Sequence, residues 1–220
     1  MEDANGEGKH TNRLDKKDLF INLCKGNATI VIDCEFEQYA SEKEAKSLAN
    51  QIMQSYGANK RADKPFNLII CGIEEGGHLD DALGRISGTE NWLCQLTYES
   101  IESLLDKEGP CEEGKESICG RELTYLSADA TDVLESVDSN NVYVIGGIVD
   151  RNRLNGITYN KAKHLGYSCK RLPIKEHIKL NSSHVLSVTA CINILLHFYK
   201  NNDWKLALQE SIPKRKLLDS

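Results

Sequence analysis

The chain has 220 residues, of which 40% are hydrophobic and 27% charged, so it is long enough for one ordinary domain with a well-formed core. No apolar run approaches the roughly 18 residues that a membrane span needs, and the first residues lack the apolar stretch of a signal peptide. We therefore expect a protein of the nucleus or the cytoplasm with no membrane partner.

The eight cysteines form no C-x2-C or C-x4-C pair. Several lie in apolar, strand-like runs, as Cys34 and Cys71 do, where a cysteine usually behaves as a small buried hydrophobe. We therefore predict reduced, structural cysteines and no metal site.

The net charge of −6 is unevenly distributed along the chain. Residues 1–150 contain 14 Lys and Arg against 29 Asp and Glu, a balance of −15, whereas residues 151–220 contain 13 against 4, a balance of +9. A basic end of this kind is typical of a surface that faces a polyanion. A solvated basic surface without a partner is the alternative explanation.

The first half of the chain begins with a polar segment, residues 1–27, which we interpret as a flexible arm. Buried strands are predicted at 28–34 and 66–71, where β-branched and apolar residues run together. Between them, Ser41 and Glu44 form a capping-box pattern at the start of a helix. One face of that helix is apolar and comprises Ala45, Leu48, Ala49, Ile52, Met53 and Tyr56.

The second half alternates between strands and helices after a glycine-rich loop at 72–88. The predicted order is a strand and a short helix within 93–105, an acidic loop at 106–121, strands at 123–127 and 142–145 that flank a short helix near 132–137, a helix at 159–165, a strand at 169–172, a long helix at 183–199 and a helical turn at 204–209. Such alternation predicts an α/β domain with a largely parallel sheet.

Three predicted strands end in turns that are suited to a ligand. One ends in Gly146 and Gly147, and Asp150 follows at once. Ligands of open α/β sheets collect at the carboxyl ends of strands, and glycines there permit close approach of the backbone. By spacing alone, a tight turn is the more frequent explanation. The strand ends at 125–129 and 171–174 are also polar or contain proline, so all three ends could form one pocket.

Six blocks together resemble a known family. They are VIDCEFE (31–37), ANQIMQSYGANKR (49–61), LTYLSADATDVL (123–134), VYVIGGIVDRNRLNGITYNKAKHLG (142–166), RLPIKEHIKLNSSHVLSV (171–188) and DWKLALQESIPKRK (203–216). The family is the tRNA guanine-9 N1-methyltransferases of the SPOUT superfamily. The resemblance implies a single domain at 28–216 with a tail at 217–220, and a parallel sheet with helices on both faces. It also implies a C-terminal trefoil knot, an exception to the rule against knots.

The resemblance further implies a monomer that needs no metal and that binds S-adenosylmethionine in the loops of the knot. The matching residues are Leu126, Ser127, Gly146, Gly147, Asp150, Leu172, Pro173, Ile174, Lys179, Leu180, Val185, Leu186 and Val188. At the head of the long helix the chain departs from the family, which commonly has an Arg-Lys pair, an Asn and a Glu. This chain has Ser183, His184, Thr189 and Asn193 there.

Methylation of guanine N1 requires removal of a proton, because N1 is protonated at neutral pH. Asp150 is the first candidate for a general base, and the alternative is that it only orients the guanine or a water molecule. Asp33 and Gln51 match polar positions of the family. Asp33 could share this task or could be a buried, hydrogen-bonded aspartate, whereas for Gln51 a packing or capping role is favoured.

The family's substrate, tRNA, would be held through its phosphates by basic side chains, which position it without reading its sequence. Candidates are Lys60, Arg61, Arg151, Arg153, Lys161, Lys163, Lys170, Arg171, Lys175, Lys179, Lys214, Arg215 and Lys216, with Asn59 beside the first two. The nucleotide at position 9 would be extruded to reach the cofactor. Two alternatives stay open: methylation of adenine N1 at the same position, and a non-catalytic tRNA-binding or processing subunit.

Overall fold

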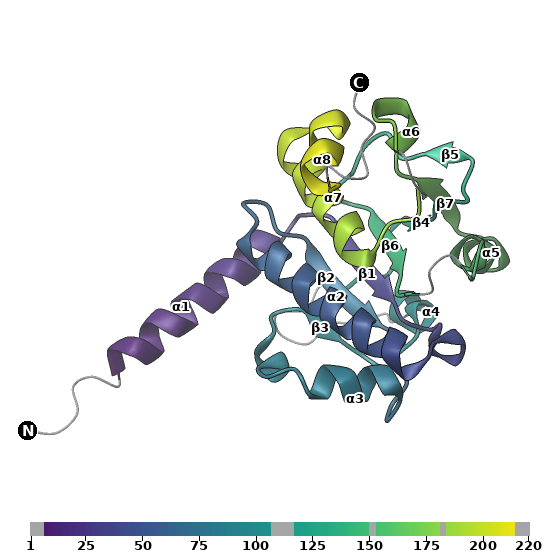
Figure 1. The fold of residues 1–220 in the computed structure, drawn as a ribbon. Coiled ribbons are helices and arrows are strands. Elements are labelled where there is room, and N and C mark those ends of the chain that lie inside the picture. The colour runs from purple at the N-terminus through teal and green to yellow at the C-terminus, as the bar shows by residue number, and fades with distance from the viewer. Residues whose placement is uncertain (1–6, 107–116, 150–152, 181–183, 214–220) are drawn as a thin grey trace, which may run out of the picture.

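The computed structural model describes residues 7–106, 117–149, 153–180 and 184–213, with only the backbone for 7–15 (Figure 1). Seven strands form one sheet: β1 (Thr29–Asp33), β2 (Asn67–Cys71), β3 (Gln95–Leu96), β4 (Leu123–Leu126), β5 (Asp132–Val133), β6 (Val142–Gly146) and β7 (Ser168–Arg171). Their order is β3-β2-β1-β6-β4-β7-β5, and each neighbouring pair is parallel. The predicted parallel sheet is therefore confirmed, and its carboxyl ends share one edge.

Helices cover both faces of this sheet. The helices of the described residues are α1 (Glu7–Cys24), α2 (Glu42–Arg61), α3 (His78–Gly84), α4 (Ile101–Asp106), α5 (Ile157–His164), α6 (Ile174–His177), α7 (Val188–Asn201) and α8 (Trp204–Ser211), with single 3-10 turns at Glu37–Tyr39 and Thr89–Asn91, and all but α1 lie close to the sheet. Because successive strand residues point to opposite faces, Ile30 and Ile32 pack with α2, α3, α7 and α8, whereas Val31 packs with α4 and α5.

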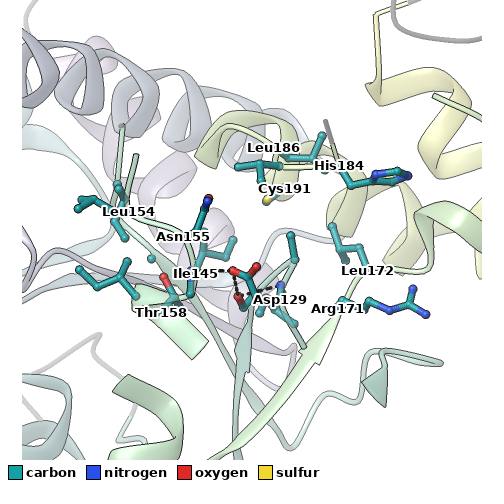
Figure 2. Close-up of a pocket in the computed structure, with 18 of the residues that line it drawn as sticks. Asp129, Ile145, Leu154, Asn155, Thr158, Arg171, Leu172, His184, Leu186 and Cys191 are labelled. Carbon is teal, nitrogen blue, oxygen red and sulfur yellow. Dashed lines mark hydrogen bonds between the residues drawn. The ribbon is translucent and has the colours of Figure 1, made fainter. Parts of the chain in front are cut away.

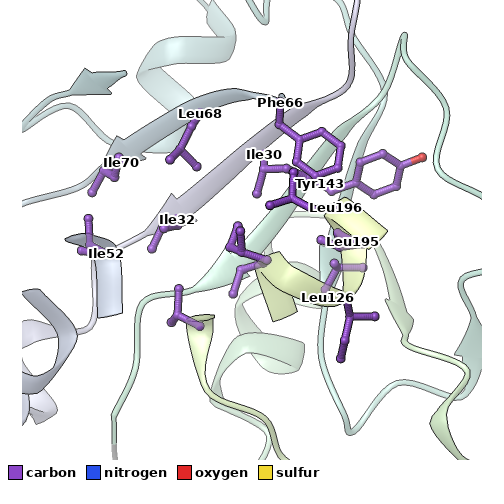
Figure 3. Close-up of a cluster of buried hydrophobic side chains, with 14 of the residues drawn as sticks. Ile30, Ile32, Ile52, Phe66, Leu68, Ile70, Leu126, Tyr143, Leu195 and Leu196 are labelled. Atoms are coloured by element: carbon purple, nitrogen blue, oxygen red, sulfur yellow. The ribbon is translucent and has the colours of Figure 1, made fainter. Parts of the chain in front are cut away.

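The larger core lies between the sheet and α2, α7 and α8 (Figure 3). Ile32, Ile52 and Leu195 are completely buried there. Burying a side chain of this kind stabilises the fold by about 1.5–3 kcal/mol. The packing of α2 against α7 thus ties the first half of the chain to the last.

Helix α2 begins as its sequence predicts. The Glu44 backbone N–H donates to Ser41 Oγ at 3.4 Å, and the Ser41 N–H donates to Glu44 Oε2 at 2.8 Å, which completes the capping box. The predicted apolar face is buried except for Met53, which is 37% exposed. Including Met53 was wrong, because it lies about 80° around the helix from Ala45, at the rim of the stripe.

Within the predicted arm, residues 1–27, Glu7–Cys24 form helix α1, which the sequence did not predict. This segment has no proline and its only glycine is Gly8, but it has little apolar periodicity, so the pattern did not reveal it. Figure 1 shows α1 projecting away from the sheet. Near its end Phe20 is buried, whereas Leu19 and Leu23 are exposed.

Two other predictions were wrong. Residues 132–133 form strand β5, where a short helix was predicted, because they pair with Lys170 and Arg171 of β7. The last long helix starts at Val188 and not near Ser183, because the Ser187 hydroxyl accepts a hydrogen bond from the Ala190 N–H at 3.2 Å and caps it.

The trefoil knot stays a prediction, with which the parallel strand order is consistent. Within the described ranges, no helix is both long and apolar enough to cross a membrane.

The capping box gives a stability prediction. We expect Ser41→Ala to lower the free energy of unfolding by about 1 kcal/mol, because the first turn of α2 loses its cap. Urea denaturation measures the loss. Ser47→Ala, within the same helix, is the control and should be neutral or slightly stabilising, since alanine is the better helix former. Equal losses in both variants would contradict the role of the cap.

Candidate functional site

The carboxyl ends of β4, β6 and β7 converge on one pocket (Figure 2). It is formed by the turns 126–129, 145–148 and 171–175, by residues 154–158 at the start of α5, and by 184–186 before α7. These are the three strand ends that the sequence singled out. The structure brings them together because β6, β4 and β7 are neighbours in the sheet.

Seven of the thirteen expected cofactor residues line this pocket: Leu126, Ser127, Gly146, Leu172, Ile174, Val185 and Leu186. Pro173, Lys179, Leu180 and Val188 do not line it, and Val188 is buried at the start of α7. Gly147 lines a smaller, adjacent pocket. Asp150 lies outside the described residues.

The pocket contains polar residues that sequence reasoning missed, namely Asp129, Asn155, Thr158 and His184. Figure 2 shows Asp129 between Asn155 and Thr158 on one side and Leu172 and Arg171 on the other. Asp129 is the last residue of the strand end at 125–129, so its position there could have identified it as a pocket residue. Asn155 and His184 come from loops without a periodic pattern, and Thr158 is the second residue of α5.

Asp129 joins two walls of the pocket. Its Oδ2 accepts hydrogen bonds from the Ser127 hydroxyl at 3.4 Å and from the Gly156 N–H at 3.0 Å. Gly156 has φ +75°, a conformation that favours glycine, and it directly precedes α5. The turn after β4 is thereby bonded to the start of α5.

The two glycines after β6 are required by neighbouring protein atoms. A Cβ on Gly146 would lie 2.5 Å from Thr158 Oγ1, and one on Gly147 would lie 2.9 Å from the Asp33 carbonyl oxygen. The Gly147 N–H donates to that same oxygen at 2.7 Å. Close packing of β6 on β1 and α5 therefore explains both glycines, and Gly146 in addition lines the pocket.

Asp33 is completely buried at the end of β1. Its Oδ2 accepts from Lys161 Nζ at 2.7 Å and from the Tyr125 hydroxyl at 3.0 Å, and its Oδ1 accepts from the Glu35 N–H at 3.1 Å. Lys161 also pairs with Glu35 Oε2 at 2.7 Å. Both carboxylate oxygens of Asp33 are thus engaged, which favours the buried, hydrogen-bonded aspartate over a proton acceptor.

Lys161 was expected at the tRNA phosphates, and the structure corrects this. Its side chain is 18% exposed and lies between Asp33 and Glu35, so its charge neutralises protein carboxylates. Its position on the inner side of α5 could not be read from a short helix with little amphipathic pattern.

Gln51 has the capping role that the sequence favoured. Its Oε1 accepts from the Val188 N–H at 3.0 Å, and its backbone carbonyl accepts from the Thr189 hydroxyl at 3.2 Å. Gln51 thereby satisfies backbone groups at the start of α7, and it does not line the pocket. Thr189, one of the departures from the family, takes part in the same contact.

The basic residues are divided between two edges of the sheet. Arg171 and Lys175 line the pocket, and Arg171 forms two hydrogen bonds, at 2.9 and 2.6 Å, with Glu176. Lys60 and Arg61 lie at the opposite edge, because α2 runs from the carboxyl end of β1 to the amino end of β2. Asn59 beside them is buried and bonds to the backbone of Phe66.

Of the other basic candidates, Lys163 and Lys179 are exposed, Lys170 is half-buried, and Arg153 donates to the Tyr39 carbonyl at 2.9 Å and to Glu44. Arg151 and residues 214–216 lie outside the described residues. Among the residues that the structure describes, no three His, Cys, Asp or Glu side chains are grouped to hold a metal ion. Six of the described cysteines, Cys34, Cys71, Cys94, Cys119, Cys169 and Cys191, are free thiols.

The protein has a seven-stranded parallel sheet with helices on both faces, and its pocket lies outside three adjacent strand ends. These features define an α/β protein with the SPOUT methyltransferase architecture. The model of the tRNA (guanine(9)-N(1))-methyltransferase TRM10/TRM10A family matches residues 1–217. The chain belongs to this family.

Individual relatives agree with this assignment. The tRNA (guanine(9)-N1)-methyltransferase of Eremothecium gossypii is 34% identical over 90% of this chain and 62% of its own length. The tRNA methyltransferase 10 homolog A of Rattus norvegicus is 31% identical over 92% of this chain and 56% of its own length. The chain thus spans about three fifths of the length of the curated relatives it matches. The crystal structure of the full-length spTrm10–SAH complex has a TM-score of 0.73 and 31% identity, over 86% of this chain and 95% of that one.

The buried ion pair gives a second prediction. We expect Lys161→Met to lower the free energy of unfolding by about 3–5 kcal/mol, because buried Asp33 loses its cation. The matched control is Lys163→Met on the same helix, which is exposed and should change stability by no more than about 0.5 kcal/mol. Similar losses in the two variants, measured by urea denaturation, would argue against this role.

The same cluster predicts loss of stability in alkali. Burial, and then the charge of Asp33, raise the pKa of Tyr125 above its usual value. Burial by itself lowers the pKa of Lys161, but Asp33 and Glu35 more than offset this, so that pKa is also raised. Both groups keep their protons in the folded state at a pH where the unfolded chain loses them. Their contribution is complete below about pH 10 and is lost as the pH rises further.

We therefore expect the free energy of unfolding to decline above about pH 10. The decline should be shallower in Tyr125→Phe, which removes one of the two titrating groups. Urea denaturation between pH 8 and 11 measures it, and an unchanged slope in the variant would show that Tyr125 does not contribute.

Proposed function

We propose that this protein transfers a methyl group from S-adenosylmethionine to N1 of guanine at position 9 of tRNA. The observation that carries the proposal is the pocket at the ends of β4, β6 and β7 in a chain that belongs to this family. The relative of similar fold is a complex with SAH, the product that S-adenosylmethionine leaves after giving up its methyl group.

The residues of the pocket fit such a cofactor. Its walls are largely apolar, with Leu126, Ile145 and Leu172 among them, and a few polar groups such as Asp129 converge on it. This combination is typical of sites for nucleoside-like ligands. The adenosine part would be held by the turns 126–129, 145–148 and 171–175, and the bound cofactor would supply an electrophilic methyl group on its sulfonium.

The chain's own residues would provide placement and proton transfer. Turns that are bonded to one another, as Ser127, Asp129 and Gly156 are, hold the two reactants in line, which is the main source of rate in a direct transfer. Asp33 is engaged with Lys161 and Tyr125, so we assign the base to Asp150. A free aspartate has a pKa near 3.9, so burial beside the ligands would have to raise the pKa of Asp150.

We propose tRNA as the partner, bound through its phosphates by basic groups that include Lys163, Lys175 and Lys179. All three side chains are exposed, and Lys175 lines the pocket. We further propose that the protein works as a monomer without a metal, in the nucleus or the cytoplasm, as the family resemblance implies.

If Asp150 is the base, its substitution should affect methylation of guanine and of adenine differently. Adenine N1 has a free lone pair and needs no base, so Asp150→Asn should lower guanine methylation by about 10²–10⁴-fold and spare adenine methylation. The measurement uses unmodified tRNA transcripts with guanine or adenine at position 9, read by mass spectrometry. Equal loss on both transcripts would contradict the base assignment.

Two further outcomes bear on the proposed function itself. Methyl groups at other positions of the transcript would refute the assignment of the target. No heat of binding in a calorimetric titration with S-adenosylmethionine would favour the non-catalytic tRNA-binding alternative.

A further inference from the structure

A second, smaller pocket lies beside the first, outside the carboxyl ends of β1 and β6. It is lined by segment 34–45, by Leu48 and Leu79, and by Gly147–Val149. Ile148 and Leu154 line both pockets, so the two pockets share a boundary. The second pocket is therefore adjacent to whatever the first one binds.

Its position in the sheet is one where ligands bind. From β1 the chain crosses one face by α2 to reach β2 on one side, whereas from β6 it crosses the other face by α5 toward β7 on the opposite side. The strand order thus reverses between β1 and β6. Crevices of open α/β sheets form at such reversal points.

Glu37 places a carboxylate in this pocket. Its Oε1 accepts hydrogen bonds from the backbone N–H groups of His78 and Leu79, at the start of α3. A Cβ on Gly77 would lie 2.9 Å from Glu37 Cδ, so the carboxylate rests directly on that glycine. The group is held in one orientation by backbone atoms, as a recognition residue requires.

The other oxygen of Glu37, Oε2, is buried and accepts no hydrogen bond from any described residue. Buried carboxylate oxygens are normally hydrogen-bonded, so an unengaged one on a residue that lines a pocket needs a donor from elsewhere. The second glutamate of the pocket, Glu44, is already bonded to Ser41 and Arg153. Glu37 therefore offers the acceptor that a ligand would use.

The surroundings of Glu37 suit a flat base better than a cation. Phe36, Leu48 and Leu79 are buried apolar residues of the same pocket, and metal ions of the oxygen-binding kind need several oxygen ligands. Guanine presents N1–H and the N2 amino group as donors on one edge, which a carboxylate accepts. Adenine has no donor at C2 and turns its N1 lone pair toward that edge, so the carboxylate would repel it.

We propose that this second pocket receives the Watson–Crick edge of the target guanine and that Glu37 accepts a hydrogen bond from its N2 amino group. Glu37 is then a specificity-determining residue that favours guanine over adenine. The inference rests on the proposed function, which supplies the substrate. Tyr39 lines the pocket and its carbonyl accepts a hydrogen bond from Arg153, and both of these side chains are about half exposed.

The test compares tRNA transcripts with guanine or inosine at position 9, because inosine keeps N1–H and lacks only the N2 amino group. In single-turnover methylation at saturating enzyme, we expect the wild-type protein to be about 10- to 100-fold faster on guanine, the usual effect of one hydrogen bond to a charged group. Equal wild-type rates on the two transcripts would overturn the proposal without any variant. Failure to methylate guanine at all would instead refute the proposed function.

Glu37→Gln assigns the effect to this side chain. The glutamine oxygen can still accept from the backbone N–H groups of His78 and Leu79. The NH2 group of the glutamine, which is a donor, takes the place of the acceptor Oε2. We expect the rate on guanine to fall to that on inosine, whose rate should change little. A ratio of guanine to inosine that stays at the wild-type value would overturn the role of Glu37.

Glu75→Gln, an exposed glutamate one turn before α3, is the matched control and should keep the wild-type ratio. Glu37→Asp retains a carboxylate and should keep part of the preference. If Glu37→Gln proves too unstable to assay, a reduced ratio of guanine to inosine in Glu37→Asp supports the role of Glu37, and the full wild-type ratio in this variant with a shorter reach overturns it.

Discussion

The parallel direction of all seven strands is the constraint on which the rest of the molecule depends. It places every carboxyl end at one edge of the sheet, so residues far apart in sequence, such as Asp33, Leu126 and Gly146, end beside one another. The crossover helices must then cover the two faces. Both pockets lie at this edge, and the smaller one lies where the strand order reverses between β1 and β6.

A buried charge cluster holds this edge together. Lys161 of α5 is bonded to Asp33 and Glu35 after β1, and Tyr125 of β4 donates to the same aspartate. The cluster thus joins three elements beneath the pockets. A carboxylate that is bonded in this way is suited to hold a helix in place and poorly suited to accept a proton, which leaves the chemistry to groups at the pocket wall.

The two adjacent pockets suggest a division of labour. The larger one is largely apolar, with turns bonded to one another, as a nucleoside-like cofactor requires. The smaller one presents a fixed carboxylate oxygen among apolar side chains, which suits the donor edge of a guanine. Ile148 and Leu154 line both pockets, so the two pockets adjoin one another.

By itself, the sequence determined the strands other than β5, the capped helix α2, the three pocket-forming turns and the family, because periodicity, capping and motif blocks are local patterns. Only the tertiary structure decided where polar side chains point. Lys161 became a buried partner of Asp33, Gln51 a cap for α7, and residues 132–133 a strand, since each is determined by a neighbour distant in sequence. The unengaged oxygen of Glu37 likewise exists only because the folded chain buries it without a partner among the described residues.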